Sequence, residues 1–120
     1  MLLLMIIFHI IDDFLLQGSL AKLKQKQWWE ESAPDKLYKY DYIICLIIHA
    51  FEWSFMILLP FAFIQHFNYS IPFVVVLVFN TIIHAFIDNL KANKKAINLI
   101  IDQSLHLVQI IFTYLIMTLV

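Results

Sequence analysis

The sequence predicts an all-α integral membrane protein, a four-helix bundle of four transmembrane helices joined by short loops. Three observations support this fold class. Of the 120 residues, 62% are hydrophobic and 14% are charged, whereas a soluble domain has about half and about a quarter. All eight basic residues are lysines, and they gather in two segments that leave four apolar stretches. Each stretch has the roughly 20 residues that a helix needs to cross a bilayer core of about 30 Å.

The four apolar stretches set the bounds of the predicted spans, which are residues 1–21, 42–65, 72–90 and 96–120. Helices are expected because hydrocarbon offers no hydrogen-bond partner to free backbone groups. The third stretch is rich in Val and Ile, which favours a strand in water, but its length and apolar surroundings favour a helix. Residues 22–41 form the predicted cytoplasmic loop, and the chain 1–120 is expected to be a single transmembrane domain.

The lysines also predict the orientation of the chain. They lie in residues 22–41 and 91–95, and the connection 66–71 has none. Because cytoplasmic loops carry the excess of Lys, both termini are expected outside the cytoplasm, in a multi-pass protein of the inner membrane. The net charge of −1 leaves no basic footprint for nucleic acid. The expected partner is the lipid bilayer, and a homo-oligomer is left open.

Each predicted span carries one histidine and at least one carboxylate at helical spacing. Residues three or four apart lie on one face of a helix, so each pair can chelate one ion, as histidine pairs do in helical zinc motifs. At 1.5 Å rise per residue, most of these groups fall in one layer, roughly 9 to 18 Å below the cytoplasmic surface. The pairs are His9-x-x-x-Asp13, His49-x-x-Glu52, His84-x-x-x-Asp88 and Asp102-x-x-x-His106.

The spans contain five acidic residues and no lysine. Ionisable groups inside a bilayer are costly unless they are compensated, and they mark functional sites. The carboxylates therefore require protonation, access of water or a bound cation, and the neighbouring imidazoles favour the cation. Asp12 lies about 100° from Asp13 around a regular helix, so it is expected behind the ligands or facing water.

A site of one or two divalent ions is predicted. Mixed imidazole and carboxylate ligands suit Zn²⁺, Mn²⁺ or Fe²⁺ better than Ca²⁺. His49 or Glu52 is the predicted catalytic base, and Gln17 and Lys91 continue two of the helix faces and are predicted to contact substrate. The predicted metal ligands are His9, Asp13, His84, Asp88, Asp102 and His106.

Four segments carry a resemblance to a known family. They are His9-Ile-Ile-Asp12-Asp13-Phe14-Leu-Leu-Gln17, His49-Ala50, His84-Ala-Phe-Ile-Asp88 with Lys91, and Ile101-Asp102-Gln103-x-x-His106. With them the chain resembles, over nearly its whole length, the small bacterial and phage membrane proteins catalogued as domain of unknown function 3307. The resemblance implies a compact multi-span membrane protein and no particular activity. A more distant similarity is to inner-membrane proteins labelled metal-dependent hydrolases.

Three classes of function are left open. The first is a metal-dependent hydrolase acting on a lipid or a lipid-linked phosphate or ester. The second is a metal-ion transporter or carrier that uses His-x-x-x-Asp pairs, although the chain has no His-rich loop and no second polar gate. The third is a non-catalytic membrane interaction factor. The sequence has neither the His-Glu-x-x-His motif of zinc proteases nor the repeated His-x-x-x-His boxes of lipid desaturases.

Overall fold

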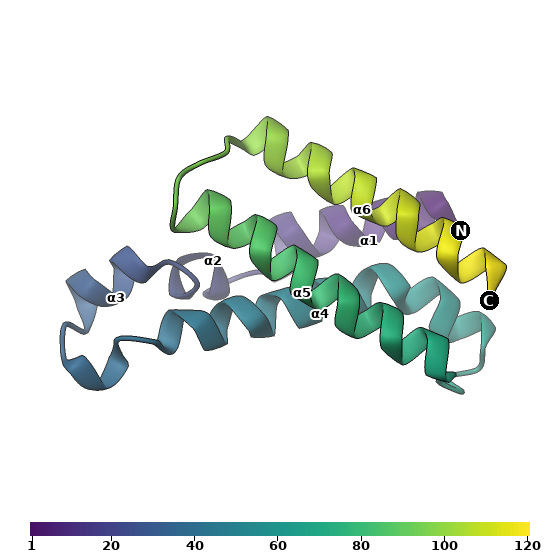
Figure 1. Ribbon diagram of the computed structural model, residues 1–120, viewed down its shortest axis with the longest axis horizontal. Helices are drawn as coiled ribbons and strands as arrows, with labels where there is room; N and C mark the ends of the chain where they lie inside the picture. The colour runs from purple at the N-terminus through teal and green to yellow at the C-terminus, as the bar shows by residue number, and fades with distance from the viewer.

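The regular structure of the protein is entirely helical (Figure 1), in a computed structural model that describes residues 1–120. Three helices are long and apolar enough to cross a membrane. They are α4 (Asp41–Ile64), α5 (Ile71–Ala92) and α6 (Leu99–Leu119). The all-α prediction is confirmed, and these helices coincide with the last three predicted stretches.

The first predicted helix, 1–21, is wrong as one continuous element. The chain forms α1 (Leu2–Ile11), a π-helical turn η1 (Asp12–Leu16) and, after a break, the short helix α2 (Leu20–Leu23). Gly18 makes the break with a φ of +51°, a left-handed conformation that costs glycine little. The π-helical turn holds both aspartates of this segment, and such turns occur frequently at functional sites.

Local capping explains where the last two helices begin. The hydroxyl of Ser70 accepts a hydrogen bond from the N–H of Phe73, and Pro72 occupies the first turn of α5, where its missing N–H costs nothing. Asn98 accepts from the N–H of Ile101 at 3.0 Å and caps α6. The fourth predicted span therefore begins at Leu99 and not at residue 96.

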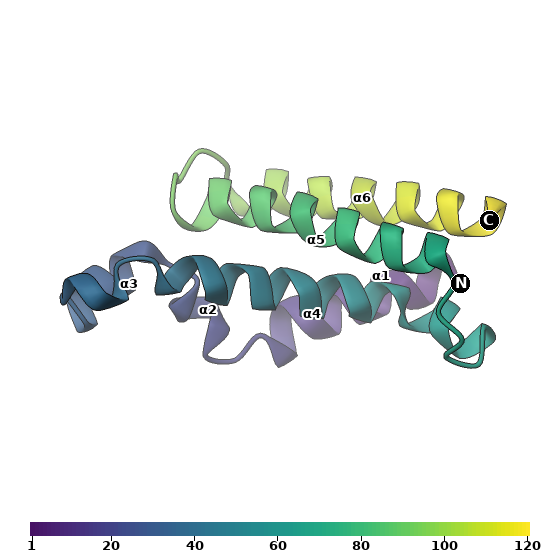
Figure 2. The ribbon, with the colours of Figure 1, turned by 60° about the horizontal axis from the view of Figure 1, so that its bottom comes forward.

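The two lysine-bearing loops lie at one end of the molecule, and both termini lie at the other (Figure 2). The first loop is partly helical, with α3 (Lys26–Ser32) and the 3-10 turn η2 (Lys36–Tyr38). Asn93, at the end of α5, joins the loops because its side chain accepts from the N–H of Lys26 at 2.7 Å and donates to the carbonyl of Lys24 at 3.1 Å.

The bundle has an apolar core and an apolar surface. α4 and α5 pack on each other, α6 packs on α5, and α1 contacts both α4 and α6. Phe79, Ile82, Phe86 and Phe112 are among many large apolar side chains that are more than half exposed. An apolar surface of this extent is costly in water and suits lipid. The core is formed by Met5, Trp53, Ile57, Leu58, Phe61, Ala62, Phe73, Val76, Ile110 and Met117.

Candidate metal centre

The structure brings one histidine from each of α1, α4, α5 and α6 together inside the bundle. All four imidazoles are at most 2% exposed. The aspartates that follow or precede them in the sequence turn toward the same place. We name this set the His/Asp cluster; it comprises His9, Asp12, Asp13, His49, His84, Asp88, Asp102 and His106.

Four donor atoms at the centre of the cluster have the spacing of metal ligands. His49 Nε2 lies 3.3 Å from His84 Nε2, 3.4 Å from Asp88 Oδ2 and 3.5 Å from Asp13 Oδ1. His84 Nε2 is 3.8 Å from the same Asp88 oxygen. Ligands around a tetrahedral ion, with bonds of about 2.0–2.2 Å, stand roughly 3.3–3.6 Å apart. Asp13, His49 and His84 can therefore hold one divalent ion, and Asp88 Oδ2 adjoins the two histidines of this group.

A second group of donors adjoins the first through Asp88. His106 Nε2 lies 3.6 Å from Asp88 Oδ1 and 3.4 Å from Asp102 Oδ1, and His84, Asp88 and His106 can together hold an ion. Asp88 thus turns one oxygen to each group. In two-metal sites the ions stand about 3.5–4 Å apart, a separation that one carboxylate can bridge. The arrangement accommodates one ion or two.

Many polar atoms of the cluster are buried without a hydrogen-bond partner. Buried polar groups in folded proteins are bonded in the large majority of cases, and each unsatisfied one costs about 1–3 kcal/mol. A bound ion that contacts several of these atoms removes that cost for them. They are both oxygens of Asp12, Oδ1 of Asp13 and Asp102, Nδ1 of His49 and His84, and both ring nitrogens of His106.

His9, a predicted ligand, lies beside these donors and holds a neighbour in place. Its Nδ1 accepts from Trp53 Nε1 at 2.7 Å, and its Nε2 lies 3.1 Å from Gln103 Oε1. Both ring nitrogens are therefore engaged. The amide of Gln103 in turn donates to Asp13 Oδ2 and to Asp102 Oδ2, each at 3.1 Å. His9 orients the carboxylates through Gln103 and belongs to neither ligand group.

Two lysines reach the cluster, so the expectation that its carboxylates have no ammonium partner is wrong. Lys24 is only 8% exposed, and its Nζ donates to Asp88 Oδ2 at 2.5 Å. Lys91 donates to Asp102 Oδ2 at 2.7 Å. The reason is the break at Gly18, which lets α2 return toward α4 and α5. With its four aspartates ionised, the cluster and the two lysines still carry a formal charge of −2, which one divalent ion neutralises.

The remaining predicted residues are placed as follows. Glu52 is partly buried, and its side chain makes no hydrogen bond or ion pair. Asp12 is fully buried, and its Oδ2 lies 4.0 Å behind His49 Nδ1. Gln17 lies 3.5 Å from His49 Nε2 and donates to the carbonyl of Asp13 at 3.2 Å.

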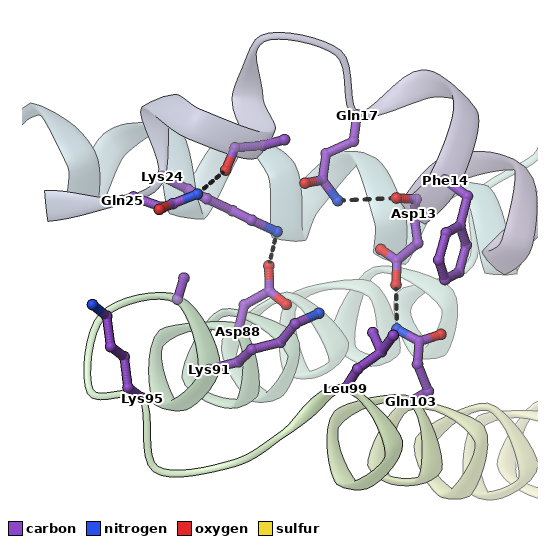
Figure 3. Close-up of a pocket in the computed structure, with 12 residues that line it drawn as sticks. Asp13, Phe14, Gln17, Lys24, Gln25, Asp88, Lys91, Lys95, Leu99 and Gln103 are labelled. Atoms are coloured by element: carbon purple, nitrogen blue, oxygen red, sulfur yellow. Dashed lines mark hydrogen bonds and ion pairs between the residues drawn. The ribbon is translucent and has the colours of Figure 1, made fainter. Parts of the chain in front are cut away.

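A cavity of about 400 Å³ opens beside the cluster at the end of the bundle that carries the lysine loops (Figure 3). Asp88 lies between the ammonium groups of Lys24 and Lys91, and Asp13 lies beside Gln103 (Figure 3). The polar lining of the cavity comprises Asp13, Gln17, Lys24, Gln25, Asp88, Lys91, Lys95 and Gln103. A polar ligand in this cavity therefore contacts Asp13 and Asp88 directly.

Three residues of the site were not predicted as site residues, namely Lys24, Trp53 and Gln103. Gln103 stands inside the Asp102-Gln103-x-x-His106 segment, and Trp53 follows His49 by four residues. The sequence could have indicated both, because Gln103 is three residues from His106 and Trp53 is four residues from His49, so each shares a helix face with a histidine. Lys24 carries no such signal, because its approach depends on the break at Gly18.

The fold and the site define an all-helical protein with three helices suited to a membrane and a buried histidine–aspartate centre. The chain belongs to the family described as protein of unknown function (DUF3307), whose family model matches residues 1–120. The predicted family is thus confirmed. No curated protein and no solved structure matches the chain.

Proposed function

We propose that this protein is a small integral membrane protein with an intramembrane divalent-metal centre, and that it is a metal-dependent hydrolase. The substrate class we propose is a lipid or a lipid-linked phosphate or ester. The observation that carries the proposal is the convergence of His49 Nε2, His84 Nε2 and oxygens of Asp13 and Asp88, between 3.3 and 3.8 Å, inside the bundle.

Nitrogen and oxygen donors in equal number suit Zn²⁺, Mn²⁺ or Fe²⁺. Such an ion acts as a Lewis acid that activates water and polarises a phosphoryl or ester oxygen. His49 is proposed here as a ligand and not as the catalytic base, because its Nε2 faces three other donor atoms. Asp12, behind His49 Nδ1, is proposed to orient that ring, as carboxylates commonly do for metal-bound histidine.

The cavity supports an anionic, membrane-derived substrate. Lys91 and Lys95 line it together with Gln17, so it offers cationic and amide donors beside the centre. The helices around it present apolar side chains outward, where lipid chains reach the bundle. By the positive-inside rule the lysine end is proposed to face the cytoplasm, and the proposed substrate to enter from the inner leaflet of the inner membrane. The α1–η1 segment is proposed as the fourth, shorter membrane element.

The opposite half of the bundle favours an enzyme over a metal carrier. A carrier needs a polar route to the other side of the membrane. Beyond the His/Asp cluster, the interior is filled largely by apolar side chains such as Ile57, Phe73 and Ile110. Three polar side chains there, Asn80, Gln109 and Thr113, hydrogen bond to one another. The two groups of His, Asp or Glu side chains that could hold a metal ion both lie in the His/Asp cluster.

Elemental analysis of the protein, purified in detergent without chelators, tests the metal centre. Wild type is expected to hold one or two ions per chain, and Asp88→Ala and Asp102→Ala are expected to hold less. The matched control is Asn80→Ala, which removes a buried polar side chain outside the cluster. A wild-type content below about one tenth of an ion per chain contradicts the proposal, since folded metal sites retain their ion.

Turnover and transport separate the two metal-dependent functions. A hydrolase is expected to cleave a phosphorylated lipid in mixed micelles, with the rate lost in His84→Ala and kept in Asn80→Ala. A carrier is expected instead to move Mn²⁺ or Zn²⁺ into proteoliposomes and to be impaired by Asn80→Ala. Transport without lipid cleavage contradicts the hydrolase assignment and leaves the metal centre standing.

A further inference from the structure

Lys24 occupies the position at the cluster that a metal ion also requires. Its ammonium is in short contact with Asp88 Oδ2, and this same oxygen faces His49 Nε2 at 3.4 Å and His84 Nε2 at 3.8 Å. A divalent ion bound by these donors uses the same oxygen. An ammonium and a divalent cation repel each other strongly at such separations. The two cations therefore compete for Asp88.

The side chain of Lys24 has space into which it can turn. It lines the cavity of about 400 Å³, and Figure 3 shows the ammonium groups of Lys24 and Lys91 both turned into the space around Asp88. A lysine has a flexible four-carbon stem, so its ammonium can turn from Asp88 into the cavity without movement of the backbone. Lys95 also lines the cavity, and its one side-chain partner is Gln27, at 3.2 Å.

We propose that the lysine-lined cavity is a phosphate-binding site that forms when a divalent ion takes the place of Lys24 at Asp88. The freed Lys24 ammonium joins Lys91 and Lys95 around the phosphate group. This inference rests on the proposed metal centre and adds to it an order of binding, with the metal first and the phosphate second. Phosphate and ammonium form strong charge-assisted hydrogen bonds, which replace the ion pair that Lys24 gives up.

The exchange has a consequence that a purely structural lysine does not have. Loss of the Lys24 charge removes the competitor of the metal, so metal affinity rises. The same loss removes a phosphate donor, so phosphate affinity falls. A lysine that only holds the fold together affects both affinities in the same direction when it is removed. Thermodynamic linkage further requires that metal and phosphate raise each other's affinity by the same factor.

The test measures both affinities on the full chain in detergent micelles. Mn²⁺ binding is followed by electron paramagnetic resonance of the free ion, and ³²P-labelled inorganic phosphate by equilibrium dialysis, with and without saturating Mn²⁺. For wild type, Mn²⁺ is expected to raise phosphate affinity by at least about fivefold, the lower range of coupling between sites. For Lys24→Gln, Mn²⁺ affinity is expected to rise and phosphate affinity to fall, each about tenfold, as for the gain or loss of one strong charge contact.

Two further variants sharpen the result. Lys95→Gln, whose lysine contacts no carboxylate of the cluster, is expected to weaken phosphate binding and to leave Mn²⁺ binding unchanged. Lys36→Gln, on η2 outside the cavity, is the matched control and is expected to change neither. If Lys24→Gln does not fold by circular dichroism, Lys24→Met keeps the apolar stem and carries the same expectation.

The outcomes distinguish this inference from the proposed function. Wild-type protein that binds no Mn²⁺ overturns both. Wild-type protein that binds Mn²⁺, with a Lys24→Gln variant that binds it more weakly or binds phosphate as before, overturns only the exchange. Competition with unlabelled phosphate compounds distinguishes a lipid headgroup from a soluble phosphate. Displacement of the label by phosphatidic acid in micelles, and not by glycerol phosphate, identifies a lipid headgroup, whereas equal displacement identifies a soluble phosphate.

Discussion

Helices α5 and α6 enclose two buried polar groups that behave differently. The one nearer the chain termini consists of Asn80, Gln109 and Thr113. Gln109 donates to Asn80 Oδ1 at 2.8 Å and to its carbonyl at 2.9 Å, and Thr113 donates to Asn80 Oδ1 at 2.9 Å. Only Gln109 Oε1 lacks a partner. These neutral groups satisfy one another across the helix interface, which is how polar side chains join helices in membranes.

Half of the His/Asp cluster lies on the same two helices, closer to the lysine loops. His84 and Asp88 on α5 face Asp102 and His106 on α6, yet both nitrogens of His106 and one oxygen of Asp102 have no hydrogen-bond partner. The cluster also retains a formal negative charge with its two lysines included. Burial and polarity are therefore common to both groups, and the unsatisfied, uncompensated atoms distinguish a binding site from a helix contact.

The largest expected effect is that of removing the metal. If the ion binds only the folded state, stability falls by about 4 kcal/mol on going from a metal concentration of 1,000 times Kd to none. Thermal unfolding in detergent, with and without a chelator, measures this difference. Asn80→Ala is expected to keep the response to chelator in full. If the chelator does not change the unfolding temperature of wild type, the cluster holds no stabilising ion and only joins helices, as Asn80, Gln109 and Thr113 do.

Loss of one ligand is the next largest effect. His84→Ala is expected to weaken metal binding by more than about 100-fold, beyond the 10–100-fold that is typical for partners outside the ligand set. His84 belongs to both candidate ligand groups. Competition with a metal-sensitive dye measures the affinity. A His84→Ala variant that is folded and binds metal as wild type does contradicts the proposed ligand set.

Asp12 tests how far the cluster extends beyond its ligands. Asp12→Asn is expected to weaken metal binding by about 10–100-fold, because the carboxylate no longer orients His49 through Nδ1. The substitution keeps the size of the side chain, so the packing is preserved. Equal affinity of Asp12→Asn and wild type, by the same dye competition, indicates that the 4.0 Å approach of Asp12 to His49 has no role in binding.

The smallest effect is expected at the helix contact itself. Thr113→Val removes the hydroxyl that donates to Asn80 and keeps the shape of the side chain. It is expected to lower stability by about 0.6 kcal/mol, the average for hydrogen bonds between membrane helices, and by at most about 1.7 kcal/mol, and to leave metal content unchanged. Denaturant unfolding in mixed micelles gives the first quantity, and elemental analysis gives the second. If Thr113→Val loses metal, the contact of Asn80, Gln109 and Thr113 supports metal binding and is not independent of the His/Asp cluster.

Spacing along single helices made much of the cluster predictable. His84 and Asp88, and likewise Asp102 and His106, are four residues apart on regular helices, so the sequence alone places each pair on one face. Their burial followed from the apolar residues around them. Distance from the ends of the spans predicted that the pairs lie in one layer, and the structure does bring histidines and aspartates of different helices together. Glu52 was expected near the other acids, and its charge does act on the buried Asp12, although its side chain makes no hydrogen bond or ion pair.

The sequence by itself determined the helical class, the three long apolar helices and the one-sided pairing of histidine with aspartate, because these depend on local composition and on helical periodicity. Only the tertiary structure decided which groups meet. It engaged both nitrogens of His9 with Trp53 and Gln103, and it brought Lys24 to Asp88 by way of the break at Gly18. These contacts join residues from different helices, and the geometry that joins them depends on packing and on one backbone turn.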